Sequence, residues 1–152
     1  QLLEEGMGFE ELCRKTEEMI PNSKVFFCLK TLEYLQKGGR ISKTVAIAGS
    51  LLSIKPVVSV VDGEVALLGK ARGSRQGNNF LIQQIQKDGI DFSRPFFLGY
   101  TGLSDALLQK YISDSAEIWK EHVEHLPIGT IGGAIGTHVG PGAIAVAFFT
   151  EK

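Results

Sequence analysis

The chain has 152 residues, 43% of them hydrophobic, so it is long enough for one compact domain that buries a substantial core. Its apolar runs are far shorter than the roughly 20 residues that a membrane-spanning helix needs, which excludes a transmembrane segment. Cys13 and Cys28 fit neither a metal spacing nor a disulfide framework, so we expect two small buried hydrophobic residues in a reduced, cytoplasmic protein.

The net charge of −1 is unevenly distributed. Between residues 37 and 75 the chain has seven basic residues and only two acidic ones, so this segment is strongly positive and the remainder negative. Such a segment is either an ordinary solvated surface or a patch that faces an anion or an acidic partner. The seven bases are Lys37, Arg40, Lys43, Lys55, Lys70, Arg72 and Arg75.

The beginning of the chain predicts helical structure followed by a buried strand. Residues 1–6 resemble the last turn of a helix closed by a glycine, and the chain lacks an initiator Met, so we expect a segment to precede it. Residues 9–20 have one apolar helical face and are followed by Pro21, which predicts an amphipathic helix. The apolar run at residues 24–29 is typical of a strand covered on both faces.

Two short helices and a hairpin are expected next. Thr31 is a candidate cap for a helix that ends before Gly38, and Ser42 for a second helix toward residue 52. Strand-like runs at residues 56–61 and 64–68 flank Asp-Gly, the strongest short-range hairpin signal.

The second half alternates helices and strands. Residues 74–87 predict a helix and residues 95–100 a strand. Ser104 opens a long amphipathic helix that carries Leu108, Trp119 and Val123, with Trp119 in the core. The last two strands are expected at residues 128–135 and 143–150, joined by a loop that contains His138.

The order of elements predicts an α/β (α+β) fold. No repeat or linker divides the chain, so a single mixed sheet of about six strands covered by helices follows.

Two glycine-framed segments each present one functional side chain. Arg40 follows two glycines, which lets the backbone turn tightly and leaves the guanidinium free to offer its donor fork to an oxyanion. His138 is flanked by residues with small side chains, so it is a candidate binding residue. The alternative is that it has only a structural role in a turn. A permanent cation beside a titratable donor suggests a site for a carboxylate or phosphate.

Other chemistries have weaker support. The glycines between residues 129 and 142 lead into a strand rather than a helix, and Pro141 has no amide hydrogen, so a nucleotide-binding loop is disfavoured. No glycine-elbow serine accompanies any histidine. His122 and His125 lie three residues apart, which allows a metal site, but a solvated helix end explains them as well.

Three separated motifs resemble the DegV family of bacterial fatty-acid-binding proteins. They are residues 27–42, with Leu-Gln-Lys-Gly-Gly-Arg-Ile-Ser at their end; residues 49–58, followed by Asp62-Gly63 and Lys70-Ala-Arg72; and residues 135–142, Ile-Gly-Thr-His-Val-Gly-Pro-Gly. Their order and spacing match over nearly the whole chain.

The resemblance implies a carrier rather than an enzyme, with a long-chain fatty acid as ligand and no cofactor or metal. Members of the family bury the fatty acid between two α/β domains and present its carboxylate to a dihydroxyacetone-kinase-like fatty acid kinase, whose acyl phosphate product enters phospholipid synthesis. By motif, Arg40, His138 and Thr137 belong to the head-group network, and Arg72, with Lys70 and Arg75, to the kinase contact.

The sequence also departs from the family pattern. Val139 stands where members often have a hydroxyl residue, and the N-terminal domain with the direct carboxylate ligands is not in the chain. By this resemblance residues 1–8 end the last helix of that domain, and residues 9–152 form the C-terminal domain.

A nucleic-acid- or phosphate-binding module built on residues 37–75 is the alternative function. It is disfavoured because the segment lacks aromatic residues for base stacking, and a modest basic patch gives little affinity at physiological salt.

Overall fold

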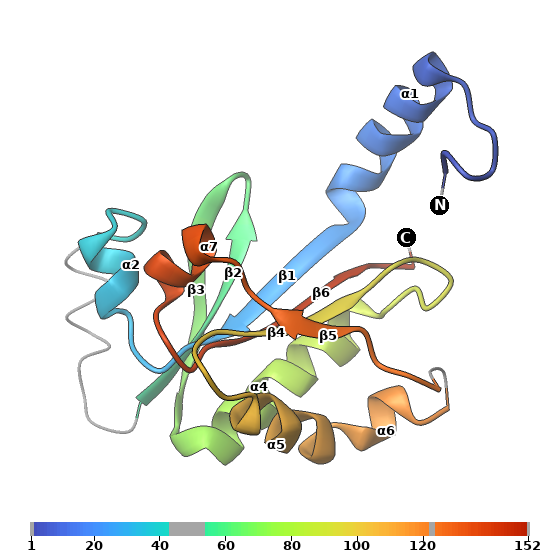
Figure 1. The fold of residues 1–152 in the computed structure, drawn as a ribbon. Coiled ribbons are helices and arrows are strands. Elements are labelled where there is room, and N and C mark those ends of the chain that lie inside the picture. The colour runs from blue at the N-terminus through green and yellow to red at the C-terminus, as the bar shows by residue number, and fades with distance from the viewer. Residues whose placement is uncertain (1, 43–53, 122–123, 152) are drawn as a thin grey trace.

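The computed structural model describes residues 2–42, 54–121 and 124–151. Its centre is a six-stranded sheet with the strand order β3-β2-β1-β6-β4-β5 (Figure 1). Neighbouring strands are antiparallel except for β4 and β5, which are parallel, so the prediction of a mixed six-stranded sheet is confirmed. The strands are β1 (Ser23–Cys28), β2 (Ile54–Val61), β3 (Glu64–Arg72), β4 (Phe97–Tyr100), β5 (Ile128–Thr130) and β6 (Ile144–Phe149).

Helices pack on both faces of the sheet. Helices α4, α5 and α6 contribute to one hydrophobic core, and α2 and α7 contribute to a second core on the opposite face. Helix α1 extends away from the sheet, and none of its residues is buried (Figure 1). The helices are α1 (Phe9–Met19) with the short 3-10 helix η1 (Ile20–Asn22), α2 (Glu33–Lys37), α4 (Gly73–Asp88), α5 (Ala106–Asp114), α6 (Ala116–Trp119) and α7 (Gly133–Val139).

Strand β1 is buried on both faces, as its continuous apolar sequence predicts. Successive side chains of a strand point to opposite faces, so Phe26 and Cys28 lie in the core beneath α4, whereas Phe27 lies in the core beneath α2 and α7. Burial of each of the two phenylalanine side chains contributes about 1.5–3 kcal/mol to stability. The two cores therefore share a single central strand.

The hairpin between β2 and β3 forms at Asp62-Gly63, as predicted. Both residues have positive φ, 51° at Asp62 and 80° at Gly63, the conformation that a two-residue type I′ turn requires. The strands continue beyond the predicted limits to Ile54 and Arg72, which are paired with one another.

The prediction of one long helix after Ser104 is wrong, because the helix breaks at Ser115. The Ser115 hydroxyl donates a hydrogen bond to the Tyr111 carbonyl at 2.7 Å and accepts one from Trp119 Nε1 at 2.8 Å. A serine hydroxyl that bonds to the preceding turn competes with the backbone bonds that continue a helix. The break directs Trp119 into the core, where it stacks on Phe96 with ring centroids 5.8 Å apart.

The prediction of a strand over residues 128–135 is also wrong beyond Thr130. Strand β5 has three residues, and helix α7 follows, so Thr137 and His138 lie on a helix rather than in a loop. Gly132 precedes the helix in an extended conformation, and Val139 at its end is buried in the second core. Tertiary burial of that end outweighs the weak helix propensity of a glycine-rich segment.

The cysteine prediction is confirmed for Cys28 and wrong for Cys13, which is exposed because α1 projects from the sheet. The helix predicted from Ser42 toward residue 52, and Val123, lie outside the described residues. Among the described helices, none has the length and apolar character to span a membrane.

Candidate functional site

The helices that precede or carry the predicted site residues begin at one end of the sheet. At this end Cys28 of β1 pairs with Ile144 of β6, Ile144 with Tyr100 of β4, and Tyr100 with Thr130 of β5. Helices α2 and α7 therefore begin after strands that finish at the same end. Helix α4 also begins there, because Arg72 at the end of β3 pairs with Ile54 at the start of β2. Helices α2 and α7 lie on one face there, and α4 on the other (Figure 1).

The structure brings His138 to the backbone just before Arg40. A Cβ atom placed on Gly38 would overlap Nδ1 of His138 and lie 2.9 Å from its Cε1, so the imidazole packs directly on this glycine. The Arg40 guanidinium donates a hydrogen bond to the Gly38 carbonyl at 3.0 Å. Gly38 is thus the common neighbour of the two side chains that sequence reasoning selected as an anion site.

The imidazole of His138 has an unusual environment. Its Nδ1 is buried, and no hydrogen-bond partner for it is found among the described residues. Buried polar atoms are nearly always paired in folded proteins, and the explanations for one that is not include local strain, a bound water or ion, and a functional role. This ring nitrogen is therefore consistent with a binding role.

A second close contact holds α2 against the end of α7. A Cβ atom on Gly140 would lie 2.7 Å from Cε2 of Tyr34, so the tyrosine ring covers this glycine, whose φ is 76°. Sequence reasoning missed Tyr34, although the glycine that ends the His138 segment was an indirect signal of such a contact. Together the two glycine contacts fix the position of His138 relative to α2.

Thr137, the third predicted head-group residue, lies next to His138 on α7 and is exposed. Its hydroxyl donates to the Gly133 carbonyl of the same helix at 2.8 Å. The oxygen of that hydroxyl can still accept a hydrogen bond, whereas its proton is already used.

Arg40 lies at the rim of a groove between the end of α2 and the β2–β3 hairpin. The groove has a volume of about 860 Å³, within the range of small-molecule sites. Val65 and Leu67 of β3 give it an apolar floor that continues the second core. Its described lining residues are Gly39, Arg40, Ile41, Ser42, Gly63, Glu64, Val65 and Leu67.

The other predicted basic residues lie around the junction of β3 and α4: Lys70 and Arg72 belong to the end of β3, and Arg75 to the first turn of α4. Arg72 is the residue preceding α4, and its backbone N–H is capped by the Gln76 side chain at 2.9 Å. Arg72, Arg75 and Lys70 are not buried. None of the three is among the described residues that line the groove beside Arg40.

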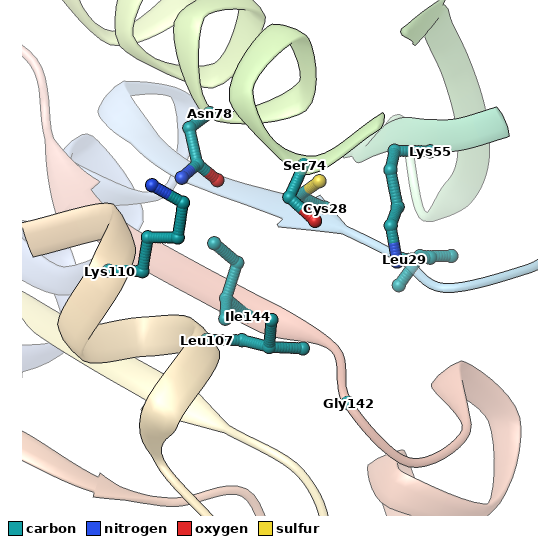
Figure 2. Close-up of a pocket in the computed structure, with 9 residues that line it drawn as sticks. All are labelled: Cys28, Leu29, Lys55, Ser74, Asn78, Leu107, Lys110, Gly142 and Ile144. Carbon is teal, nitrogen blue, oxygen red and sulfur yellow. The ribbon is translucent and has the colours of Figure 1, made fainter. Parts of the chain in front are cut away.

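A small pocket lies beside this basic region, between α4, α5 and the ends of β1 and β6 (Figure 2). Lys55 and Lys110 reach it from two different elements, but its volume of about 20 Å³ admits little more than a water molecule. Burial raises the pKa of the Cys28 thiol in this pocket to about 11, an effect that nearby Lys55 partly opposes. The thiol is thus protonated and unreactive at neutral pH.

The described residues give no support to the metal alternative. No cluster of three or more metal-ligating side chains occurs in the part of the chain that the structure describes. His125 is exposed, and His122 lies outside the described residues.

The structure thus combines a mixed six-stranded sheet with an arginine and a histidine that meet at one glycine. The DegV family model, described as an uncharacterised protein family, matches residues 1–151, so this chain belongs to the DegV family. The chain is 34% identical over 151 residues to a DegV domain-containing protein of Clostridium acetobutylicum, covering 97% of this chain and 51% of that protein. The chain thus spans about half the length of the curated relatives it matches.

Solved structures agree on the fold. A fatty-acid-binding DegV family protein of Streptococcus agalactiae matches with a TM-score of 0.74 and 26% identity, over 99% of this chain and 53% of that one. The Fatty Acid Kinase (Fak) B3 protein of Streptococcus pneumoniae, loaded with linoleic acid, matches with a TM-score of 0.85 and 22% identity, over 99% and 52% of the two chains.

Proposed function

We propose that this chain is part of a cytoplasmic fatty-acid-binding protein, and that Arg40 and His138, with Thr137 beside them, belong to the network around the carboxylate. The single observation that carries the proposal is the contact of the His138 ring with Gly38, whose carbonyl also holds the Arg40 guanidinium. A buried carboxylate without partners costs several kcal/mol, and charge-assisted donors offset that cost.

The groove beside Arg40 suits a ligand with a charged head and an apolar tail. Burial of a tail of about sixteen carbons, at ~0.8 kcal/mol per methylene, gives a gross driving force on the order of 10 kcal/mol. Val65 and Leu67 supply apolar surface next to the cation. A free phosphate has no apolar part that could be buried against this floor.

The relatives support the same ligand class. The Streptococcus agalactiae protein is described as fatty acid binding, and the Streptococcus pneumoniae protein holds linoleic acid. Because this chain spans about half of such proteins, we propose that residues 9–152 are the C-terminal domain, that residues 1–8 end the preceding domain, and that both domains enclose the acyl chain.

We further propose that the protein is a carrier that presents the carboxylate to a dihydroxyacetone-kinase-like fatty acid kinase. The name of the Streptococcus pneumoniae relative, Fatty Acid Kinase B3, supports a kinase partner. The bases around the junction of β3 and α4, Lys70, Arg72 and Arg75, are the proposed contact. Positive side chains oppose the dipole at the beginning of a helix, so an external acidic partner gives them a role.

Mass spectrometry of lipids extracted from the purified full-length protein tests the ligand assignment. A stoichiometric long-chain fatty acid is the expected result. Recovery of no fatty acid, together with no uptake of added palmitate, would refute the proposal.

A further inference from the structure

Thr101 links the end of β4 to the segment between α7 and β6, residues 140–143, which we call the connection. It lies one residue beyond β4 and is only 3% exposed. Its backbone N–H donates to the Ala143 carbonyl at 3.0 Å, and its carbonyl accepts from Gly142 N–H at 3.0 Å. These two bonds extend the pairing of β4 with β6 by one step.

The Thr101 hydroxyl adds two bonds that the strand pairing does not require. Its Oγ1 donates to the Gly140 carbonyl at 2.6 Å and accepts from Ala143 N–H at 2.9 Å, and both bonds are buried. A single buried hydroxyl thus satisfies one buried acceptor and one buried donor of the connection. An unpaired buried backbone group carries its full desolvation cost, so no apolar side chain can replace this hydroxyl.

Gly140 is the residue through which this anchoring reaches the candidate site. Its N–H caps α7 by donating to the Gly136 carbonyl at 2.8 Å, while its carbonyl is held by Thr101. His138 lies two residues earlier on the last turn of α7, against Gly38. Movement at Gly140 is therefore transmitted to the imidazole through one short helical turn.

The connection also borders the pocket on the other face of the sheet. Gly142 lines that pocket together with Leu107 of α5 and Ile144 of β6 (Figure 2). The connection thus has packed neighbours on both sides, and Thr101 is a buried side chain that bonds to it.

We propose that Thr101 is a positioning residue for His138: its hydroxyl fixes the end of α7 so that the imidazole stays on Gly38, facing the anion site. The inference rests on the proposed function for its ligand, but the geometric part stands independently of any ligand. Thr101 does not touch the fatty acid in this proposal, and it acts only through Gly140.

The test compares Thr101→Val, which keeps the shape and removes the hydroxyl, with Thr101→Ser, which keeps the hydroxyl. Ser115→Ala is the matched control, because Ser115 is equally buried and its hydroxyl also donates to a backbone carbonyl and accepts one hydrogen bond, but at the end of α5 on the opposite face. The first readout is the NMR resonance of His138 Cε1–H in this chain, assigned with His138→Ala. The second is the Kd of the full-length protein for palmitate.

Thr101→Val is expected to shift the His138 resonance and to raise the palmitate Kd about tenfold, the equivalent of one net hydrogen bond. Thr101→Ser should retain the wild-type His138 resonance and palmitate Kd. Ser115→Ala should lower the melting temperature without changing the resonance or the Kd. If Thr101→Val does not fold, Thr101→Cys, with its weaker donor, should give an intermediate shift.

An unmoved His138 resonance in a folded, destabilised Thr101→Val or Thr101→Cys variant would overturn the proposal and leave Thr101 with a structural role alone. Failure of the wild-type full-length protein to bind palmitate would instead refute the proposed function, while the resonance would still report on positioning.

Discussion

Gly38 and His138 are in direct contact across the junction of α2 and α7, with the imidazole lying where any side chain at position 38 would be. The contact joins two segments that are a hundred residues apart in the chain, and it places a titratable ring beside the Arg40 turn. The first prediction follows from it. Gly38→Ala must displace the imidazole, because Cβ contacts below 3.0 Å essentially do not occur.

We expect Gly38→Ala to lower the affinity of the full-length protein for palmitate about tenfold or more, since overpacking costs typically about 1–3 kcal/mol and here acts on the site itself. Isothermal calorimetry measures the effect. Gly133→Ala is the control on the same helix as His138, because a Cβ atom at position 133 would have no described neighbour within 4 Å. Equal affinities for both variants would contradict the importance of the contact.

The second prediction concerns the two head-group candidates directly. Arg40→Ala or His138→Ala in the full-length protein should reduce fatty acid retention about 10- to 100-fold, because hydrogen bonds to charged groups contribute about 1.5–3 kcal/mol. Quantification of co-purified fatty acid gives the result. The melting temperature should change little for Arg40→Ala, since its side chain is exposed and bonds only to the local backbone among the described contacts. Loss of cooperative melting in both variants would show that the residues are structural.

The third prediction concerns the length of the chain. The 152-residue chain should unfold cooperatively but bind palmitate far more weakly than the full-length protein, because we propose that the acyl chain is enclosed between this domain and a preceding one. Calorimetry with palmitate or oleate on both proteins is the measurement. Equal affinities would mean that the C-terminal half binds the ligand alone.

The fourth prediction concerns the basic start of α4. Arg72→Glu should slow acyl phosphate formation by the kinase, mainly by weakening association, and leave the fatty acid content unchanged. Lys87→Glu, the same charge change on an exposed residue at the other end of α4, is the control.

The measurement is kinase turnover as a function of carrier concentration. Superimposable curves for wild type and Arg72→Glu would remove Arg72 from the contact. Loss of lipid from the variant would place it in the ligand site instead.

The fifth prediction uses the two cysteines. Cys13 is exposed on α1 and should react with iodoacetamide at pH 8, whereas Cys28 should not, because burial raises its pKa to about 11 and only the thiolate is nucleophilic. The sign follows from the raised pKa: the fraction of thiolate stays small until the pH approaches that value. Mass spectrometry should show one label on the wild type and no label on Cys13→Ser. Labelling of Cys28 in the folded protein would contradict the burial that the structure assigns to it.

Local sequence patterns were sufficient to predict several elements of the fold. Asp62-Gly63 specified the hairpin because its backbone conformation needs positive φ at both positions, and the apolar sequence of β1 specified a strand buried on both faces. The glycine pair before Arg40 and the glycines around His138 pointed to these two side chains by residue type and spacing alone.

Tertiary structure decided what local patterns left open. The helix breaks at Ser115 because Trp119 is buried in the core and bonds to the Ser115 hydroxyl. Residues 133–139 are helical because Val139 is buried in the second core. The meeting of His138 with Gly38 arises from strand register, which puts the ends of β1 and β5 at the same end of one sheet. Such pairings join residues far apart in sequence, and no local preference encodes them, because they are fixed only when the sheet and both of its cores form together.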